Sequence, residues 1–379
     1  NKCLFSSFIN IIDDYRNIYN NRRWLDRSVN MFVKKISKIF ITNIVILLIF
    51  IISVEVIFGY WFDSDNFGPY MREHRMKNQR ILWENKKEKV SYFYRRNYHG
   101  FRGADINPAN IQGVILGGSV IDERYKPEKY TITEFLNDRL KKHYADIRFI
   151  NGGIEAQSTV GMLSGFNNWL LKLENFSPKF IIFYIGINDV NVSDNISSND
   201  SDGHILNPNK KEIFFDNIKS RSIILDSIRK IKFYYLPREG FVKYDGKLTQ
   251  DYLNNYNFIK YAYATENYDI GLLKEIYKKK INNYLSRIDQ LEKYSRKINA
   301  TPIFINNIGS TGHEKKIFIL NRSLIKHCVK KSYNCIDLAR KLDPKIDFWI
   351  DGFHTTKEGS RNIAETIFPD LKKIISNLN

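Results

Sequence analysis

Two short segments near opposite ends of the chain carry side chains whose types suit acyl transfer. The segment GVILGGS (113–119) ends on Ser119, and DGFHTTKEGS (351–360) holds Asp351 and His354 three residues apart. That spacing lets the carboxylate accept the Nδ1 proton of the imidazole, which leaves the second ring nitrogen free to take a serine proton. Either segment alone is a weak signal, because Gly-Gly-Ser turns and Asp-x-x-His loops are common. Together they predict a nucleophile, Ser119, a general base, His354, and its orienting carboxylate, Asp351.

Two segments between these ends offer hydrogen-bond donors for an oxyanion. YIGIND (184–189) places Asn188 just after an apolar run, where its side-chain amide can donate to developing negative charge. INGGIEAQST (150–159) supplies a tight turn whose backbone N–H groups can do the same. The glycines match neither the G-x-x-x-x-G-K-[ST] of a P-loop nor the G-x-G-x-x-G of a dinucleotide site. Nucleotide binding is therefore disfavoured.

An alternating β/α fold with a parallel sheet must position these segments. Apolar runs separated by helical patterns predict strands that end beside each candidate residue, and the carboxyl ends of parallel strands meet at one edge of a sheet. A capping box of Thr131 with Glu134 is expected to open one helix, and Thr355 with Glu358 the last. The expected strands are 114–118, 147–151, 179–186, 302–306 and 335–339, and the expected helices are 131–143, 160–173 and one that ends near 299.

The blocks GGS, N-x-G-x-x-A, G-x-N-D and D-x-x-H stand in the order found in SGNH (GDSL-like) hydrolases, and the chain resembles that family over about residues 97–368. The resemblance implies a serine esterase or acyltransferase without metal or organic cofactor, built as a three-layer α/β/α sandwich with a flavodoxin-like parallel sheet of five strands. It also implies an oxyanion hole formed by the backbone N–H groups of Ser119 and Ala156 and by the Asn188 amide. NYHGFRG (97–103), with an apolar helix before it, is similar to a membrane-anchored subgroup associated with bacterial surface polysaccharides.

Two positions depart from the family pattern. Gly118 stands where the first block often has an aspartate, a residue outside the catalytic set. Ala156 stands where the second block has a glycine that donates its backbone N–H, while Gly152 and Gly153 do not align with that position. An alanine can serve this role provided that the turn does not demand a positive φ.

Residues 39–62 form an apolar run long enough to cross a bilayer, which takes about 20 residues. A buried core helix would show periodic polar residues, and a cleaved signal peptide would have a shorter leader and a small-residue exit. The run is therefore predicted to be a membrane anchor. Residues 1–38 carry eight Lys or Arg against three Asp, so the positive-inside rule places them in the cytoplasm. The anchor is expected to cross the inner or cytoplasmic membrane once. The residues after it are expected to face the periplasm or the outside of the cell.

The expected organisation has four parts. A basic cytoplasmic segment (1–38) precedes the transmembrane helix (39–62), a lead-in segment (63–109) and the hydrolase domain (110–379). A polar and aromatic stretch at about 191–270 is expected to be an insertion in that domain. Its composition suits a lid, a substrate-binding subdomain or a flexible loop that leads into helices.

Charge and cysteine content limit the possible partners and the redox chemistry. The formal net charge of +18 by itself favours anionic partners such as nucleic acid or a membrane surface. Lys and Asn are abundant throughout and no nucleic-acid-binding motif is present, so nucleic acid is not expected as a partner. Cys328 and Cys335 are expected to be separate thiols rather than a short-loop disulfide, because disulfide geometry is demanding.

The predicted function is hydrolysis of acyl esters, most simply acetyl esters on a cell-surface glycan. An O-acetyltransferase would use the same triad and differ in how the acyl-enzyme is shielded from water. A non-catalytic glycan-binding or assembly subunit would keep the fold without the chemistry, because fold alone does not establish function. A basic membrane-surface or nucleic-acid binder rests on net charge alone, and it would gather basic residues on one face away from the serine.

Overall fold

The computed structural model divides into two compact units, Asn1–Trp61 and Phe62–Asn379. The expected orienting carboxylate, Asp351, lies outside the described residues, as do parts of the lead-in segment and most of the expected insertion. The described residues are 33–59, 61–62, 80–85, 90–192, 194, 214–215, 218, 221–225, 227–228, 231, 260–308, 314–350 and 353–377.

The first unit contains one helix, Val33–Phe58, that is long and apolar enough to cross a membrane. Its 26 residues extend roughly 39 Å at 1.5 Å per residue, more than the ~30 Å thickness of a bilayer core. None of its most apolar window is buried, which agrees with the sequence argument against a buried core helix. Glu55, the acidic residue within it, accepts a hydrogen bond from Trp61 Nε1 at 3.0 Å.

The second unit is built on a five-stranded parallel sheet with the order β4-β3-β5-β6-β7. Counted along the chain within this sheet, that order is 2-1-3-4-5, the flavodoxin-like arrangement. The predicted fold class is confirmed. The strands are β3 (Gly113–Gly117), β4 (Phe149–Asn151), β5 (Phe180–Ile185), β6 (Thr301–Asn306) and β7 (Asn334–Ile336).

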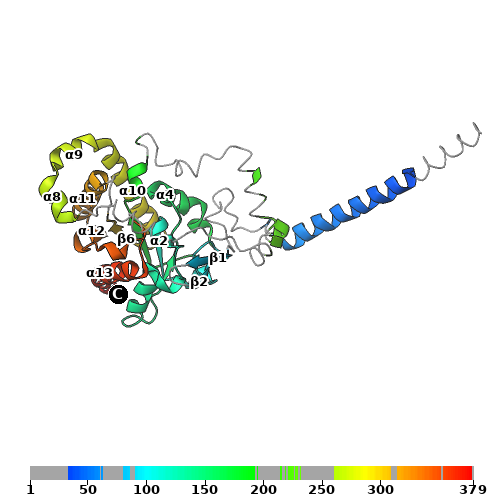
Figure 1. The fold of residues 1–379 in the computed structure, drawn as a ribbon, viewed down its shortest axis with the longest axis horizontal. Helices are drawn as coiled ribbons and strands as arrows, with labels where there is room; N and C mark the ends of the chain where they lie inside the picture. Colours follow the sequence, from blue (N-terminus) through cyan, green and yellow to red (C-terminus); the bar gives the residue numbers. More distant parts are fainter. Residues whose placement is uncertain are drawn as a thin grey trace, which may run out of the picture. The chain divides into compact units, whose positions relative to one another are not determined.

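Helices cover both faces of the sheet (Figure 1). Side chains of β3 alternate between the two layers: Val114 and Leu116 belong to one apolar core, and Ile115 belongs to the other. The first core includes α4, α10 and α11, and the second includes α3 and α13. The helices are α2 (Ser119–Asp122), α3 (Ile132–Leu140), α4 (Thr159–Asn168), α8 (Tyr261–Asn267), α9 (Ile270–Ile276), α10 (Lys278–Lys297), α11 (Glu314–Lys331), α12 (Leu338–Lys341) and α13 (Lys357–Ser376).

An antiparallel hairpin of β1 (Arg80–Asn85) and β2 (Val90–Arg95) precedes the sheet, within the expected lead-in segment. The chain after it joins the edge strand β4, because the Arg102 N–H donates to Asn151 O at 2.9 Å. Short 3-10 helices are η2 (Pro108–Asn110), η3 (Glu128–Tyr130), η4 (Leu170–Lys172), η5 (Asp189–Asn191) and η6 (Ile346–Phe348).

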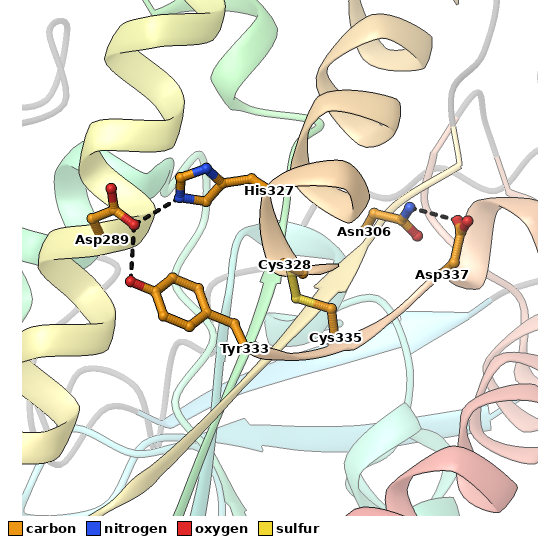
Figure 2. Close-up of a disulfide and its surroundings, with 7 residues drawn as sticks. All are labelled: Asp289, Asn306, His327, Cys328, Tyr333, Cys335 and Asp337. Carbon is orange, nitrogen blue, oxygen red and sulfur yellow. Dashed lines mark hydrogen bonds and ion pairs between the residues drawn. A yellow bond between two sulfur atoms is a disulfide. The ribbon is translucent and has the colours of Figure 1, made fainter. Parts of the chain in front are cut away.

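Cys328 and Cys335 form a disulfide, so the prediction of two separate thiols is wrong. The chain reverses between the end of α11 and β7, and this brings the two Cα atoms to 6.2 Å, within the range that disulfides need (Figure 2). Ser332 takes a φ of +55°, and the Tyr333 N–H donates to Cys328 O at 3.0 Å, which closes the turn. The sequence shows how far apart the two cysteines are along the chain, but it does not show the turn that brings them together.

Two expectations about elements also change, and one long helix was not expected. The run 335–339 is only partly a strand, because the Asp337 side chain accepts from Arg340 N and opens α12. α11 had no counterpart among the predicted elements. Thr356 rather than Thr355 caps α13, accepting from the N–H of Gly359.

Candidate active site

Ser119 and His354 meet in the folded domain although 235 positions separate them in the sequence. His354 Nε2 lies 2.8 Å from the Ser119 hydroxyl oxygen. Ser119 is buried and His354 is half-buried. At this distance an imidazole can take the hydroxyl proton as the oxygen attacks an electrophilic carbon.

Ser119 stands at the carboxyl end of β3, where the chain passes from strand to helix. Gly118 O accepts hydrogen bonds from the Ile121 and Asp122 N–H groups at 3.0 Å each. The first N–H groups of a helix have no partner within that helix. Within the described part of the chain, no acceptor takes the Ser119 N–H, which leaves it available to an anion beside the hydroxyl.

Asn188 follows β5 and packs against the residue before the serine. Its Nδ2 donates to Gln157 O at 2.9 Å, and a Cβ built on Gly118 would lie 2.0 Å from the same nitrogen. An amide nitrogen carries two hydrogens, so one donor remains beyond the bond to Gln157. The departure at Gly118 therefore has a physical cause, because any side chain there would displace the Asn188 amide.

Ala156 lies in the turn after β4, and its φ is +58°. The sequence analysis made the role of Ala156 conditional on a turn that does not demand a positive φ. That condition is not met, because the alanine occupies a left-handed conformation, which costs roughly 1–2 kcal/mol. The neighbouring donors are already used, because Gly152 N donates to Ile115 O at 2.8 Å and Gly153 N to Asn151 Oδ1 at 2.9 Å. Among the described residues no acceptor takes the Ala156 N–H.

His354 lies in the turn between η6 and α13. The backbone of this turn is fixed by a hydrogen bond from Ile350 N to His354 O at 2.7 Å. The ring of Tyr125 meets the imidazole edge-on, with centroids 5.1 Å apart and planes at 73°. The ring of Phe353 lies closer, with centroids 4.6 Å apart and planes at 59°. The imidazole thus has its Nε2 beside Ser119 and two aromatic rings against it.

A buried polar cluster joins the serine helix to the histidine turn. It consists of Glu123, Lys126, Thr355 and Ser360, and we call it the Glu123 cluster. Lys126 Nζ lies 2.8 Å from Glu123 Oε1, 2.8 Å from Thr355 Oγ1 and 2.6 Å from Ser360 Oγ. The same carboxylate oxygen accepts from Thr355 Oγ1 at 3.2 Å and from Ser360 Oγ at 2.5 Å. All four residues are buried.

A second buried network surrounds the preceding carboxylate, Asp122. Arg96 lies 2.8 Å from Asp122 Oδ1 and Arg124 lies 2.9 Å from Oδ2, while Tyr94 OH donates to Oδ1 at 2.7 Å. Burial alone would raise the pKa of Asp122, but the charges of Arg96, Arg124 and Arg102 outweigh it and lower that pKa. Burial also raises the pKa of the Tyr94 hydroxyl, which stays protonated as a donor.

The arginines of this network extend to the turn that carries Ala156. Arg96 Nη2 donates to Gly153 O at 2.5 Å, and Arg124 Nη1 lies 2.7 Å from Glu155 Oε2. Asp122 thus links the serine helix to one neighbouring turn, as Glu123 links it to the other.

A third buried network surrounds Asp189, and the sequence analysis did not predict it. Asp189 Oδ1 accepts from Thr159 Oγ1 at 2.5 Å and lies 3.5 Å from Arg287 Nη2, and its Oδ2 accepts from Gly186 N at 3.3 Å. Asp189 and Arg287 are both buried, so this ion pair fixes the loop that carries Asn188. The sequence did contain one sign of this network, because Arg287 lies on the apolar face of the helix that was predicted to end near residue 299.

Together these segments place a serine hydroxyl beside an imidazole nitrogen, with the Ser119 and Ala156 N–H groups and the Asn188 amide in the turns that follow β3, β4 and β5. Among the residues that the structure describes, no three His, Cys, Asp or Glu side chains are grouped as metal ligands would be. The arrangement suits nucleophilic attack on a carbonyl whose oxygen becomes negatively charged.

No family model and no curated protein matches the chain. Among solved structures it is similar to the psychrotrophic esterase EstA from Pseudoalteromonas sp., with 13% identity, a TM-score of 0.39 and coverage of 70% of this chain and 99% of that one. It is also similar to a mutant of Axe2, an acetyl-xylooligosaccharide esterase from Geobacillus stearothermophilus, with 11% identity, a TM-score of 0.38 and coverage of 68% and 93%. A GDSL-like lipase from Bacteroides thetaiotaomicron has 12% identity, a TM-score of 0.36 and coverage of 71% and 91%. Identities and TM-scores this low transfer neither activity nor site residues.

Proposed function

We propose that the chain is a serine ester hydrolase or acyltransferase of the SGNH type. The observation that carries the proposal is the 2.8 Å contact between Ser119 Oγ and His354 Nε2 at the carboxyl edge of a flavodoxin-like sheet. The four sequence blocks that resemble this family support it independently. Asp351 is proposed as the carboxylate that orients His354.

In the proposed reaction, Ser119 Oγ attacks the acyl carbon while its proton passes to His354 Nε2. The carbonyl oxygen becomes an oxyanion that accepts from the N–H groups of Ser119 and Ala156 and from Asn188 Nδ2. When the carbon–oxygen ester bond breaks, the leaving alkoxide takes the proton from His354. The acyl group remains on the Ser119 oxygen.

The second half of the reaction needs an acceptor with an O–H bond. Water or a sugar hydroxyl gives its proton to His354 and bonds through its oxygen to the acyl carbon. The bond from that carbon to Ser119 Oγ then breaks, and the proton passes from His354 to the serine oxygen. We propose an acetyl ester on a cell-surface glycan as the natural donor, since the subgroup that NYHGFRG (97–103) resembles is associated with surface polysaccharides. Free acetate distinguishes hydrolysis from transfer to an added oligosaccharide.

Two features support an outward-facing membrane protein. The apolar helix Val33–Phe58 follows a segment rich in Lys and Arg, the pattern of a cytoplasmic N-terminus. The Cys328–Cys335 disulfide suits an oxidising compartment such as the periplasm or the cell surface. Protease added to intact spheroplasts should therefore digest the second unit, and its survival there would contradict this orientation.

The direct test is hydrolysis of p-nitrophenyl acetate by the full chain in detergent. Ser119→Ala and His354→Ala are each expected to lower kcat at least about 10³-fold, because the triad acts as a unit. Matched controls are Ser323→Ala on α11 and His143→Ala near the end of α3, which should keep wild-type rates. A folded wild-type protein that forms neither free acetate nor a transfer product would contradict the proposal.

One observation favours a second function, the holding of an anionic polymer. A hollow of about 400 Å³ lies between α9, α10 and α11, and one acidic side chain, Glu275, is among its lining residues. Such a volume is typical of ligand sites, and the lysines among the lining residues are complementary to negative charge. Its basic lining residues are Lys274, Lys278, Lys326 and Lys330, and its apolar ones are Ile281 and Leu285.

Binding of oligogalacturonate, measured against neutral dextran oligosaccharides, tests this second function. Lys274→Ser with Lys326→Ser should weaken oligogalacturonate binding at least about tenfold, because two charge-assisted contacts are lost. The control pair, Lys141→Ser with Lys142→Ser, removes the same charge from exposed positions in the turn that follows α3. Equal weakening by both pairs would mean that binding follows net charge, which would contradict a specific site.

A further inference from the structure

Consecutive residues at the end of α2 bind the two turns that flank the serine. Asp122 is joined through Arg96 to the Gly153 carbonyl, and Glu123 is joined through Lys126 to Thr355. Thr355 directly follows His354 in the chain. Glu123 and Lys126 therefore act one residue away from the proposed base.

We propose that the Glu123–Lys126 ion pair positions His354 against Ser119, so that both are positioning residues for the proposed reaction. Glu123 follows the serine by one turn, and the Glu123 N–H donates to Ser119 O at 2.8 Å. The carboxylate is rigidly placed, because its Oε2 accepts from the Ile132 N–H at 2.6 Å at the start of α3. This proposal rests on the proposed function.

Lys126 extends the link along the histidine turn into α13. Its ammonium lies 2.8 Å from Thr355 Oγ1, 3.2 Å from Thr356 O and 2.6 Å from Ser360 Oγ. These three attachments, on two adjacent residues and one helical turn beyond them, leave the segment little freedom to slide along α2. A general base must stay within hydrogen-bond reach of its proton, and a displacement of about 1 Å can cost 10²-fold in rate.

The burial of this pair makes a positioning role separable from a stabilising one. Glu123 is 3% exposed and Lys126 is 6% exposed, so the charges lose their hydration on folding. Buried ion pairs often contribute no net stability relative to apolar side chains of similar volume, whereas removing one partner alone is strongly destabilising. We therefore expect a double substitution by apolar residues to keep the fold while it removes the attachment to Thr355.

The test compares the full chain carrying Glu123→Leu with Lys126→Met against wild type. We expect kcat for p-nitrophenyl acetate to fall about 10²-fold with KM nearly unchanged, and the Ser119 Oγ to His354 Nε2 distance in a crystal structure to lengthen beyond hydrogen-bond reach. Thr355→Val, which removes only one hydroxyl, is a second variant in case the double one does not fold. We expect it to lower kcat about tenfold.

The control is Arg139→Gln with Glu365→Gln, which breaks an exposed ion pair between α3 and α13. It should leave kcat and the serine–histidine distance unchanged. A folded double variant, or folded Thr355→Val, with wild-type kcat and an unchanged distance would overturn the proposal. If the wild type proves inactive, the proposed function fails, and the crystallographic distance alone then decides the positioning role.

Discussion

Gly118 offers a sharp test of the proposed oxyanion hole, because its missing side chain makes room for Asn188. Its φ of −80° is open to any residue, so glycine is not required there for backbone reasons. Glycine is required there because the Asn188 amide lies so close to the backbone of residue 118. A Cβ at this position would lie 2.0 Å from Asn188 Nδ2 and 3.2 Å from Gln157 O.

The expected effect of Gly118→Ala follows from these contacts. Ordinary carbon–nitrogen contact needs about 3.5 Å, so the Asn188 amide must move by roughly 1.5 Å. That movement takes Nδ2 away from both Gln157 and the oxyanion. Loss of one oxyanion-hole donor costs about 10²–10³ in kcat, or roughly 3–4 kcal/mol of transition-state stabilisation. The fold should be nearly unaffected, because the group that moves is the end of a side chain.

The assay is kcat for p-nitrophenyl acetate in a double-mutant cycle. Gly118→Ala and Asn188→Ala should each cause a loss of that size, and the double variant should lose little more than either one, because both remove the same donor. Gly271→Ala in exposed α9 is the matched control and should retain full activity. Wild-type kcat in a folded Gly118→Ala protein, or fully additive losses, would show that a Cβ at position 118 does not displace a catalytic Asn188 amide.

Three further predictions concern stability. Ala156→Gly should raise the free energy of unfolding by up to about 1 kcal/mol in urea titrations, because it relieves a left-handed alanine; a clear decrease would contradict this. The lowered folded-state pKa of Asp122 means that its carboxylate stabilises the fold above the ordinary value of 3.8 and loses that contribution as pH falls through the folded value. Asp122→Asn should therefore cost about 3–5 kcal/mol at pH 7 and give a flatter stability profile below pH 4; equal profiles would contradict it. Replacement of Cys328 and Cys335 by Ala should cost about 2–3 kcal/mol without changing kcat, because the closed loop is short, and unchanged stability would exclude the bond.

Most of the sheet could be predicted because parallel strands buried on both faces have a distinctive pattern. FIIFYI of β5 is apolar at every position, and the observed strand lies within the predicted run 179–186. The β7 region was harder, because Asp337 stops the strand and caps a helix by local side-chain chemistry. The disulfide depended on a left-handed Ser332, a conformation that apolar periodicity does not encode.

The residues of the candidate site also fall into those that the sequence could predict and those that it could not. Residues that occur at strand ends, such as Ser119 and Asn188, could be selected from the sequence, since topology brings those ends to one edge. Glu123 and Lys126 could not be selected from the sequence, because the residue types of an ion pair do not reveal whether the pair is buried or exposed to solvent. Only the fold shows that Lys126 contacts Thr355 across 229 positions of sequence and that Glu123 contacts it across 232.

Ser119 is proposed to be a nucleophile that His354 activates. Treatment of the full chain with a fluorophosphonate probe, followed by peptide mass mapping, tests it most directly. We expect one adduct on the peptide that contains Ser119, its absence in Ser119→Ala, and labelling at least about 10²-fold slower in His354→Ala. No adduct on a folded wild-type protein, or an adduct whose rate is the same in His354→Ala, would contradict the account.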